Sequence, residues 1–193
     1  MIELFDFGSK LLSFTIQVVS IGLKKNEHNI NDEWNLIKGD YKSIDFPVIF
    51  KQKQGKNWTD ILDTGWVNFF LISERMKVIL ESNKLTGWQI FPVEIYDKKG
   101  NEIFGYHGFS VIGRCSPIDY KKSEIIIKKR FSTGPECKFY KGIFIDEWNG
   151  MDFFTPEDNY QIIVTRKAAE ILKENKISNM RLENLADMEM SVE

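Results

Sequence analysis

Two stretches of this chain, residues 68–90 and residues 160–182, arrange hydrophobic and polar residues in the same order. Each begins with an apolar run typical of a buried strand and then reaches Ser73 or Thr165, both preferred residues for the start of a helix. These two positions are 92 residues apart, and the same separation aligns the rest of both stretches. The pattern predicts a strand–short helix–strand unit that is duplicated in the chain.

Each predicted helix has one apolar face and ends in a similar turn. The i, i+3, i+4 spacing of a helix face is occupied by Met76, Ile79 and Leu80 in the first stretch and by Ala168, Ile171 and Leu172 in the second. An Asn-Lys pair follows both faces, and then a hydroxyl residue and Gly87 or Asn179, which tolerate the positive φ of a tight turn. We hypothesise that Ser73 and Thr165 cap two equivalent helices on the same sheet.

Elsewhere, short strand patterns alternate with turn signals. Alternating polarity predicts a half-buried strand over residues 12–18, and turn residues predict hairpins at residues 97–101 and at Asn149-Gly150. Further strands are predicted over residues 46–50, 88–95, 103–112, 125–131 and 138–148, and single helical turns over residues 33–37 and 58–62. The fold class is therefore α+β, with mixed or antiparallel sheets and a duplicated strand–short helix–strand unit.

The composition suits one folded domain, because 42% of the 193 residues are hydrophobic, too many for a disordered chain. We predict a single domain over residues 1–193, with residues 1–65 as an N-terminal lobe, residues 66–182 as the duplicated core and residues 183–193 as an acidic tail that frays. The run over residues 11–23 is too short and too polar to span a membrane, and the first residues lack the basic start of a signal peptide. A cytoplasmic location is expected.

The charge balance argues against nucleic acid as a partner, since the formal net charge is −2. One local stretch, residues 121–130, is nevertheless basic. It has two interpretations: solvated strand ends that keep an edge from pairing, or a patch for phosphate or an acidic partner. The first is preferred.

No arrangement of residues predicts a reaction. The two His and two Cys residues show no metal-ligand spacing, and no glycine-rich phosphate loop is present. A dyad of His107 and Cys115, oriented by Asp119, fails on distance, because these residues would lie roughly 26 Å apart along one strand. Cys115 and Cys137 are interpreted as reduced thiols. We therefore predict no catalytic, cofactor-binding or metal-binding residues.

Asp146, Glu147 and Trp148 are the candidate partner-binding residues. Adjacent carboxylates on a strand point to opposite faces, so Asp146 and Glu147 are not a catalytic pair. Beside Trp148 and the predicted Asn149-Gly150 turn they would form an acidic, aromatic knob. The alternative is a solvated hairpin tip.

Several motifs together resemble a known bacterial family. They are Leu71-Ile72-Ser73-Glu74-Arg75, Leu80-Glu81, Leu85-Thr86-Gly87, Phe91-Pro92-Val93, Gly113-Arg114-Cys115, Pro117-Ile118-Asp119 with Ser123, Ile143-Phe144, Ile162-Ile163-Val164-Thr165 and Ile177-Ser178-Asn179. This set, which covers residues 46–182, resembles a family once labelled as of unknown function and now grouped with the immunity proteins of polymorphic toxin systems. Asn179 departs from the glycine that is more usual there.

The resemblance implies a cytoplasmic protein, encoded beside a secreted toxin, that binds this cognate toxin and blocks it by stoichiometric occlusion. Such a protein is not an enzyme, needs no cofactor and binds neither nucleic acid nor membrane; its interface residues do not carry over within the family. Two alternatives remain. A cleft containing His107 and a nearby carboxylate would favour a small enzyme, and an exposed apolar patch with self-association would favour a structural or adaptor module.

Overall fold

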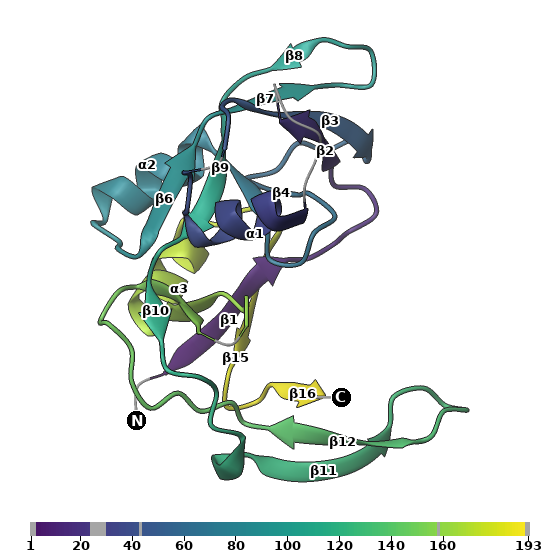
Figure 1. The fold of residues 1–193 in the computed structure, drawn as a ribbon, viewed down its shortest axis with the longest axis vertical. Coiled ribbons are helices and arrows are strands. Elements are labelled where there is room, and N and C mark those ends of the chain that lie inside the picture. The colour runs from purple at the N-terminus through teal and green to yellow at the C-terminus, as the bar shows by residue number, and fades with distance from the viewer. Residues whose placement is uncertain (1–2, 24–29, 43, 158, 192–193) are drawn as a thin grey trace.

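The computed structural model of the protein describes residues 3–23, 30–42, 44–157 and 159–191. Over these ranges the chain is mostly β-sheet, with three sheets and three α-helices (Figure 1). The sheets contain both parallel and antiparallel pairs. The α+β class with mixed sheets is thus confirmed.

The largest sheet has eight strands and curls back on itself. In order across the sheet they are β6 (Trp88–Phe91), β9 (Tyr106–Val111), β5 (Phe70–Ser73), β4 (Ile61–Asp63), β2 (Gln17–Leu23), β3 (Val48–Gln54), β7 (Val93–Tyr96) and β8 (Glu102–Ile103). Only Pro92 separates β6 from β7 in the chain, so opposite ends of the sheet must approach each other. The single strand predicted over residues 88–95 is therefore two, because proline cannot donate to a strand ladder.

The second sheet has five strands, with the first strand of the chain in its interior. Its order is β10 (Arg114–Cys115), β13 (Phe153–Pro156), β14 (Ile163–Thr165), β1 (Leu4–Ser9) and β15 (Met180–Asn184). β1 is antiparallel to both of its neighbours.

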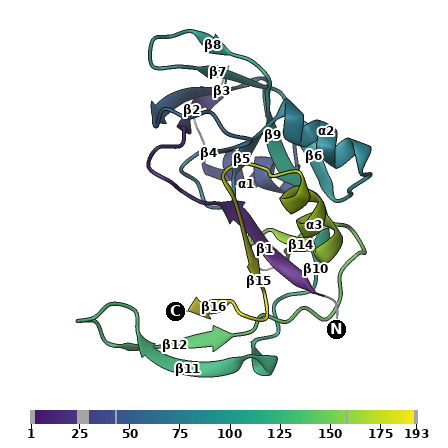
Figure 2. The same cartoon turned by 180° about the vertical axis from the view of Figure 1, so that it is seen from behind.

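The third sheet projects from the rest of the molecule and gives it the outline of a letter C (Figures 1 and 2). Its strands, all antiparallel, are β11 (Glu124–Lys129), β12 (Glu136–Lys141) and β16 (Glu189–Ser191). We call residues 124–141, which comprise β11, β12 and the turn between them, the arm. The fraying predicted for residues 183–193 is wrong where β16 forms, because this strand pairs with β12.

The α-helices are α1 (Ile30–Lys38), α2 (Glu74–Ser82) and α3 (Arg166–Glu174), and one 3-10 turn, η1, spans Tyr120–Lys122. Helix α1 is longer than the single turn predicted over residues 33–37. Helices α2 and α3 meet through Arg75, whose guanidinium donates to the backbone oxygen of Asn175. Both helices have nine residues.

Helices α2 and α3 begin and end in the same way. The Ser73 hydroxyl accepts a hydrogen bond from the Met76 N–H at 3.1 Å, and the Thr165 hydroxyl accepts one from Ala168 at 3.3 Å. Asn83 and Asn175 are the C-terminal caps. The turns that follow share positive φ at Lys84 and Lys176, and again at Gly87 and Asn179. The predicted capping by Ser73 and Thr165 is therefore present at both sites. The prediction that both helices lie on the same sheet is wrong, because β5 belongs to the eight-stranded sheet and β14 to the five-stranded sheet.

In each strand–helix–strand unit, the two strands are separated by an antiparallel strand from the other half of the chain. Strand β9 lies between β5 and β6, and β1 lies between β14 and β15. The registers correspond, since Ser73 pairs with Tyr106 where Thr165 pairs with Leu4. Residues 4–103 thus donate β1 to the second sheet, and residues 106–191 donate β9 to the first. The halves cannot separate without breaking strand pairs.

The main hydrophobic core lies where these exchanged strands meet. Phe7 of β1 contacts the ring of Phe70 from the first sheet, Phe153 from the second, and Phe109 of the other exchanged strand. Apolar residues of α2 and α3 that were predicted from the helix spacing, Met76 and Leu80 with Ala168 and Leu172, close the same cluster.

Local turn signals predicted some segments and failed at others. The hairpin at residues 97–101 is confirmed, as β7 pairs with β8. The helical turn over residues 58–62 is wrong, because this segment leads into β4, which pairs with β5. Asn149-Gly150 closes no hairpin: β13 pairs instead with β14 and β10, so distant pairing overrides the local turn preference.

Two strands have boundaries that differ from those predicted from the sequence. The strand predicted over residues 12–18 begins at Gln17 and runs to Leu23, and the strand predicted over residues 138–148 is β12, which ends at Lys141. In both cases the observed strand is the part that finds a hydrogen-bonded neighbour.

Substitution of Gly87 by alanine is expected to destabilise the fold strongly. Gly87 has φ of +90°, and a Cβ there would lie 2.0 Å from the backbone oxygen of Phe153. The control is Gly100→Ala, since Gly100 has nearly the same φ, +89°, with no atom within 4 Å of the added Cβ. Both variants carry a backbone cost of about 1–2 kcal/mol, and Gly87→Ala adds about 1–3 kcal/mol of overpacking. If Gly87→Ala and Gly100→Ala gave the same urea unfolding curve, the close approach of Gly87 to the Phe153 backbone would be contradicted.

Candidate functional site

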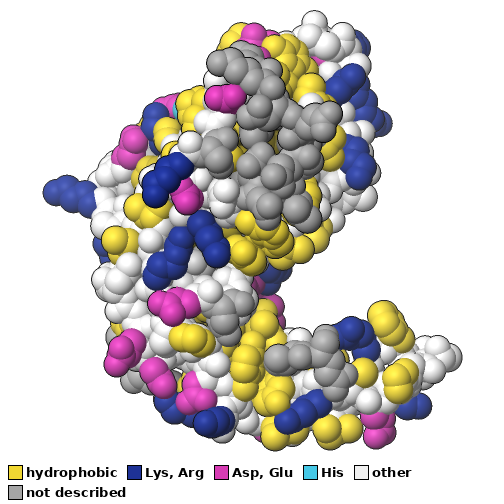
Figure 3. Space-filling view, viewed as in Figure 1, with side chains coloured by type: hydrophobic (Ala, Val, Ile, Leu, Met, Phe, Trp, Pro, Cys, Tyr) yellow, Lys and Arg dark blue, Asp and Glu magenta, His cyan; other side chains and the backbone are white. Residues whose placement is uncertain are grey.

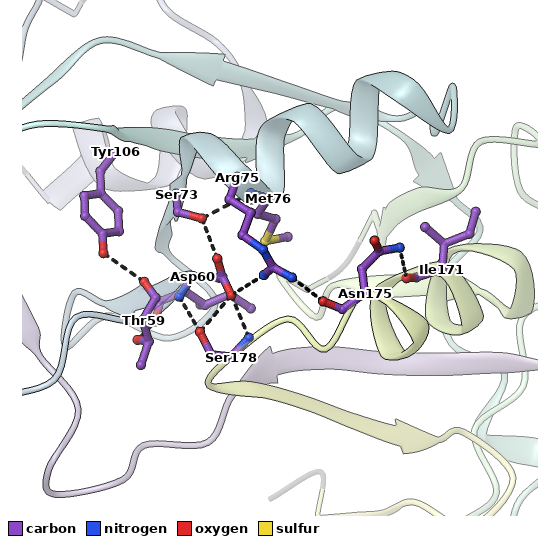
Figure 4. A network of polar contacts seen from close by, with 10 residues as sticks. Thr59, Asp60, Ser73, Arg75, Met76, Tyr106, Ile171, Asn175 and Ser178 are labelled. Carbon is purple, nitrogen blue, oxygen red and sulfur yellow. Dashed lines mark hydrogen bonds and ion pairs between the residues drawn. The ribbon is translucent and has the colours of Figure 1, made fainter.

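A network of polar contacts surrounds Asp60, directly before β4 (Figure 4). Its carboxylate accepts hydrogen bonds from the Ser73 hydroxyl at 2.8 Å, from the backbone N–H and hydroxyl of Ser178 at 2.9 and 2.8 Å, and from Arg75 at 2.8 Å. Ser73 caps α2, whereas Ser178 lies in the turn after α3. One carboxylate therefore joins the start of one helix to the exit of the other.

These contacts set the ionisation of the cluster. Burial raises the pKa of Asp60, but the hydrogen bonds from Ser178 and Ser73 and the charge of Arg75 outweigh it, so the pKa lies below its usual value. Burial and the charge of Asp60 raise the pKa of nearby Tyr106 to about 12, and its hydroxyl donates to the Thr59 backbone oxygen at 3.1 Å. Asp60 is thus an ionised acceptor whose oxygens serve the fold.

Asp152, directly before β13, makes the same set of contacts from the other side. It accepts from the Thr165 hydroxyl at 3.1 Å, from the Thr86 N–H and hydroxyl at 3.0 and 3.2 Å, and from Lys167 at 3.3 Å. Thr165 caps α3, and Thr86 lies in the turn after α2. Asp60 and Asp152 are 92 residues apart, like the caps that they bind. Each carboxylate therefore connects the helix cap of its own half to the turn after the helix of the other half.

His107 contacts a carboxylate at the surface. Its Nε2 forms a hydrogen bond with Glu74, and Lys77 contacts the same carboxylate at 3.1 Å. The hydrogen bonds from His107 and Lys77 hold the pKa of Glu74 below its usual value. The side chains of His107 and Glu74 are 24% and 50% exposed, and neither lines the cavities described below. A carboxylate within hydrogen-bonding distance of His107, as a small enzyme would need, is therefore present, but the pair lies at the surface and outside these cavities.

The predicted partner-binding residues do not form a hairpin knob. Asp146 forms an ion pair with Lys122, and the Glu147 backbone exchanges hydrogen bonds with Ser116. Trp148 is half-buried, with its ring stacked 5.9 Å from that of Phe154. Asp146 and Glu147 remain exposed at the base of the arm, so their role in binding stays a prediction.

The residues considered for catalysis or metal binding are separated. Cys115 is a buried thiol in the five-stranded sheet, whereas His107 lies in the eight-stranded one; Cys137 is a second free thiol. His28 lies outside the described residues. Among the described residues, no group of three or more His, Cys, Asp and Glu side chains could hold a metal ion.

Two surface cavities lie beside the end of β1. One of about 320 Å³ is lined by Trp66, Val67 and Leu11, among others. Another, of about 360 Å³, gathers Lys10, Lys173, Lys176 and Arg181 beside β15. In the first cavity the Ser9 hydroxyl donates to the Asp63 carboxylate at 3.1 Å, but Asp63 also accepts from Gln17 at 2.8 Å, and no histidine among the described residues lines either cavity.

The arm carries a group of exposed apolar side chains. Ile125 and Ile127 of β11 are 55% and 58% exposed, and Phe131 in the following turn is 70% exposed. Figure 3 shows hydrophobic and basic side chains together along this projection. Residues 121–130, for which solvated strand ends are the preferred interpretation from sequence, include this exposed strand. The uninterrupted Ile125-Ile126-Ile127 run is typical of a buried strand, so it does not predict this exposure.

Comparison with known proteins identifies the chain at the family level. No curated protein matches it. None of the described helices is long and apolar enough to cross a membrane. The sequence profile of the Immunity protein family (Imm11) matches residues 18–187, from β2 to the segment before β16. The resemblance read from the motifs is confirmed, and the chain belongs to the Immunity protein family (Imm11).

Proposed function

We propose that this protein binds a cognate bacterial toxin and neutralises it by stoichiometric occlusion. The observation that carries this proposal is the match of the immunity protein family over residues 18–187. In this function the protein is cytoplasmic, is encoded beside the toxin in a polymorphic toxin system, and acts without catalysis.

The polar groups of the fold support a binding role. The most heavily hydrogen-bonded carboxylates, Asp60 and Asp152, are occupied by helix caps and turns of the protein itself. Exposed apolar side chains, in contrast, stand on the arm, where they are available to a partner. An occluding protein needs such a surface and does not need a reactive group.

The alternatives have weaker support. The contact of His107 with Glu74 is the observation expected of a small enzyme, but these partly exposed side chains belong to no described cavity. A structural or adaptor role would use the same apolar surface for self-association. Toxin binding accounts for both the family and the exposed surface.

The test is a pull-down with the product of the adjacent gene, followed by co-expression of both proteins. We expect a stable one-to-one complex and the loss of toxicity. A toxin from an unrelated system serves as the specificity control. If the adjacent gene product neither binds nor loses its toxicity, the proposed function is wrong.

We also propose that the two strand–helix–strand units are duplicated copies. Support comes from the constant separation of 92 residues across the caps Ser73 and Thr165, the carboxylates Asp60 and Asp152, and the hydroxyls Thr86 and Ser178. We propose in addition that residues 1–193 form a single domain, because each half completes the sheet of the other.

A further inference from the structure

The arm has a free strand edge. Strand β12 pairs with β11 on one side and with β16 on the other, whereas β11 pairs with β12 alone among the described strands. Every second residue of β11 therefore directs its backbone N–H and C=O groups away from the sheet. Such an edge can accept another extended chain.

One face of the arm carries exposed apolar side chains, although Tyr140 on this face packs against Tyr120, with ring centroids 5.0 Å apart. The register places Ile125 opposite Tyr140 and Ile127 opposite Lys138, so these side chains share a face. Lys138 lies over the Tyr140 ring at 4.6 Å, but neither Ile125 nor Ile127 is covered. Together with Phe131 at the turn, they form an apolar strip along the free edge.

The arm also concentrates positive charge. Residues 124–141 hold five Lys or Arg residues and two Glu, whereas the whole chain has a formal net charge of −2. Lys128 forms an ion pair with Glu189, but Lys129, Arg130 and Lys138 make no ion pair among the described residues. These cations flank the apolar strip and favour an acidic ligand.

The fold does not need the arm for its core. Two segments occupy corresponding places in the fold, one between β2 and β4 and the other between β10 and β13. Each is bounded by a parallel strand pair, in which Gln17 pairs with Asp63 in the first case and Arg114 with Thr155 in the second. The first segment supplies α1 and β3 to a buried cluster. The arm contributes no residue to the described hydrophobic clusters. The exposed side chains of Ile125, Ile127 and Phe131 thus contribute little to intramolecular packing.

We propose that the arm is the toxin-binding surface: an acidic, extended segment of the toxin adds as a strand to the free edge of β11 and covers Ile125 and Ile127. This rests on the proposed toxin-binding function. A second copy of this chain fits less well, because pairing two β11 strands would bring together two arms of the same positive charge. Main-chain hydrogen bonds would supply affinity, and the apolar and basic side chains would supply specificity.

The first test is the double variant Ile125→Glu/Ile127→Glu, measured by titration against the catalytically inactivated product of the adjacent gene. We expect an affinity loss of at least about 100-fold, since two exposed apolar anchors are replaced by charges that repel an acidic segment. The matched control is Val78→Glu/Phe104→Glu, which adds the same charge at exposed apolar sites on α2 and before β9. Its affinity should stay within about twofold of the wild type.

The outcomes separate the two proposals. If the wild type does not bind the toxin, the proposed function fails. If the wild type binds and the arm variant binds equally well, the function stands and the arm is not the interface. An unchanged circular dichroism spectrum and melting temperature establish that the arm variant is folded.

The contribution of the basic side chains and the addition of a strand are tested by separate measurements. Lys129→Glu/Lys138→Glu should weaken binding about tenfold at low salt and less at high salt, because screening reduces the attraction. Amide hydrogen exchange over residues 124–129 should slow in the complex. Unchanged exchange there would refute strand addition. A concentration-dependent dimer abolished by Ile125→Glu/Ile127→Glu would instead assign the edge to a second copy.

Discussion

Replacement of Phe7 by alanine is expected to lower the free energy of unfolding by about 4 kcal/mol, a large share of the roughly 5–15 kcal/mol typical of native proteins. Phe7 is fully buried, and its ring centre lies 6.1, 6.4 and 5.7 Å from those of Phe70, Phe109 and Phe153. The loss combines the transfer of a large apolar side chain with a cavity where both sheets meet. Urea unfolding followed by tryptophan fluorescence measures it.

The control for this variant is Phe14→Ala, because Phe14 is 55% exposed and precedes β2. It should change the free energy of unfolding by less than about 1 kcal/mol. Equal effects of the two substitutions would show that β1 does not hold the second sheet together. A larger effect of Phe7→Ala, with a single unfolding transition, would support the mutual dependence of the halves.

The sequence predicted the repeated unit well where the signal is local. Helix caps, apolar faces and turn residues lie within about a dozen positions of one another, so the pattern alone places α2 and α3. Thr86 and Ser178 were also visible as repeated turn hydroxyls. Their acceptors were not, because Ser178 and Asp60 are joined only by the fold, across 118 positions.

The strand exchange left no periodic signal in the sequence. Strands β1 and β9 occupy equivalent places, yet they are separated by a different interval from that of the helices, and their sequences Leu4–Ser9 and Tyr106–Val111 share little. The choice of partner strand depends on which sheet leaves a gap between two parallel strands. That is a tertiary property, beyond the reach of local propensity.

For the arm, the sequence predicts the strand but not whether its side chains are buried. The β-branched Ile125-Ile126-Ile127 run predicted strand β11, but burial cannot be read from a strand that is apolar and basic at once. The interpretation of residues 121–130 as solvated strand ends fits their exposure. It does not explain why three consecutive isoleucines lie there, with two of them exposed.

Replacement of Asp60 by alanine is expected to cost about 3 kcal/mol, because it leaves the hydroxyl of Ser73, the N–H and hydroxyl of Ser178 and the guanidinium of Arg75 without their acceptor. The Asp60 side chain is only 11% exposed, so water replaces it poorly. Asp152→Ala should behave similarly, since Asp152 makes the equivalent contacts with Thr165 and Thr86. Asp40→Ala is the control, as Asp40 is exposed and accepts one hydrogen bond of 3.4 Å from Lys42.

The pH dependence of stability distinguishes the charge of Asp60 from its shape. The folded-state pKa of Asp60 lies below the ordinary value of 3.8, because hydrogen bonds and Arg75 outweigh burial. The ionised carboxylate therefore stabilises the fold fully above that ordinary value, and this contribution is lost as the pH falls through the folded-state pKa. Asp60→Asn, which keeps the size but not the charge, should lower stability at pH 7 and flatten its decline below pH 4. A decline as steep as that of the wild type would mean that Asp60 does not brace the two halves through its charge.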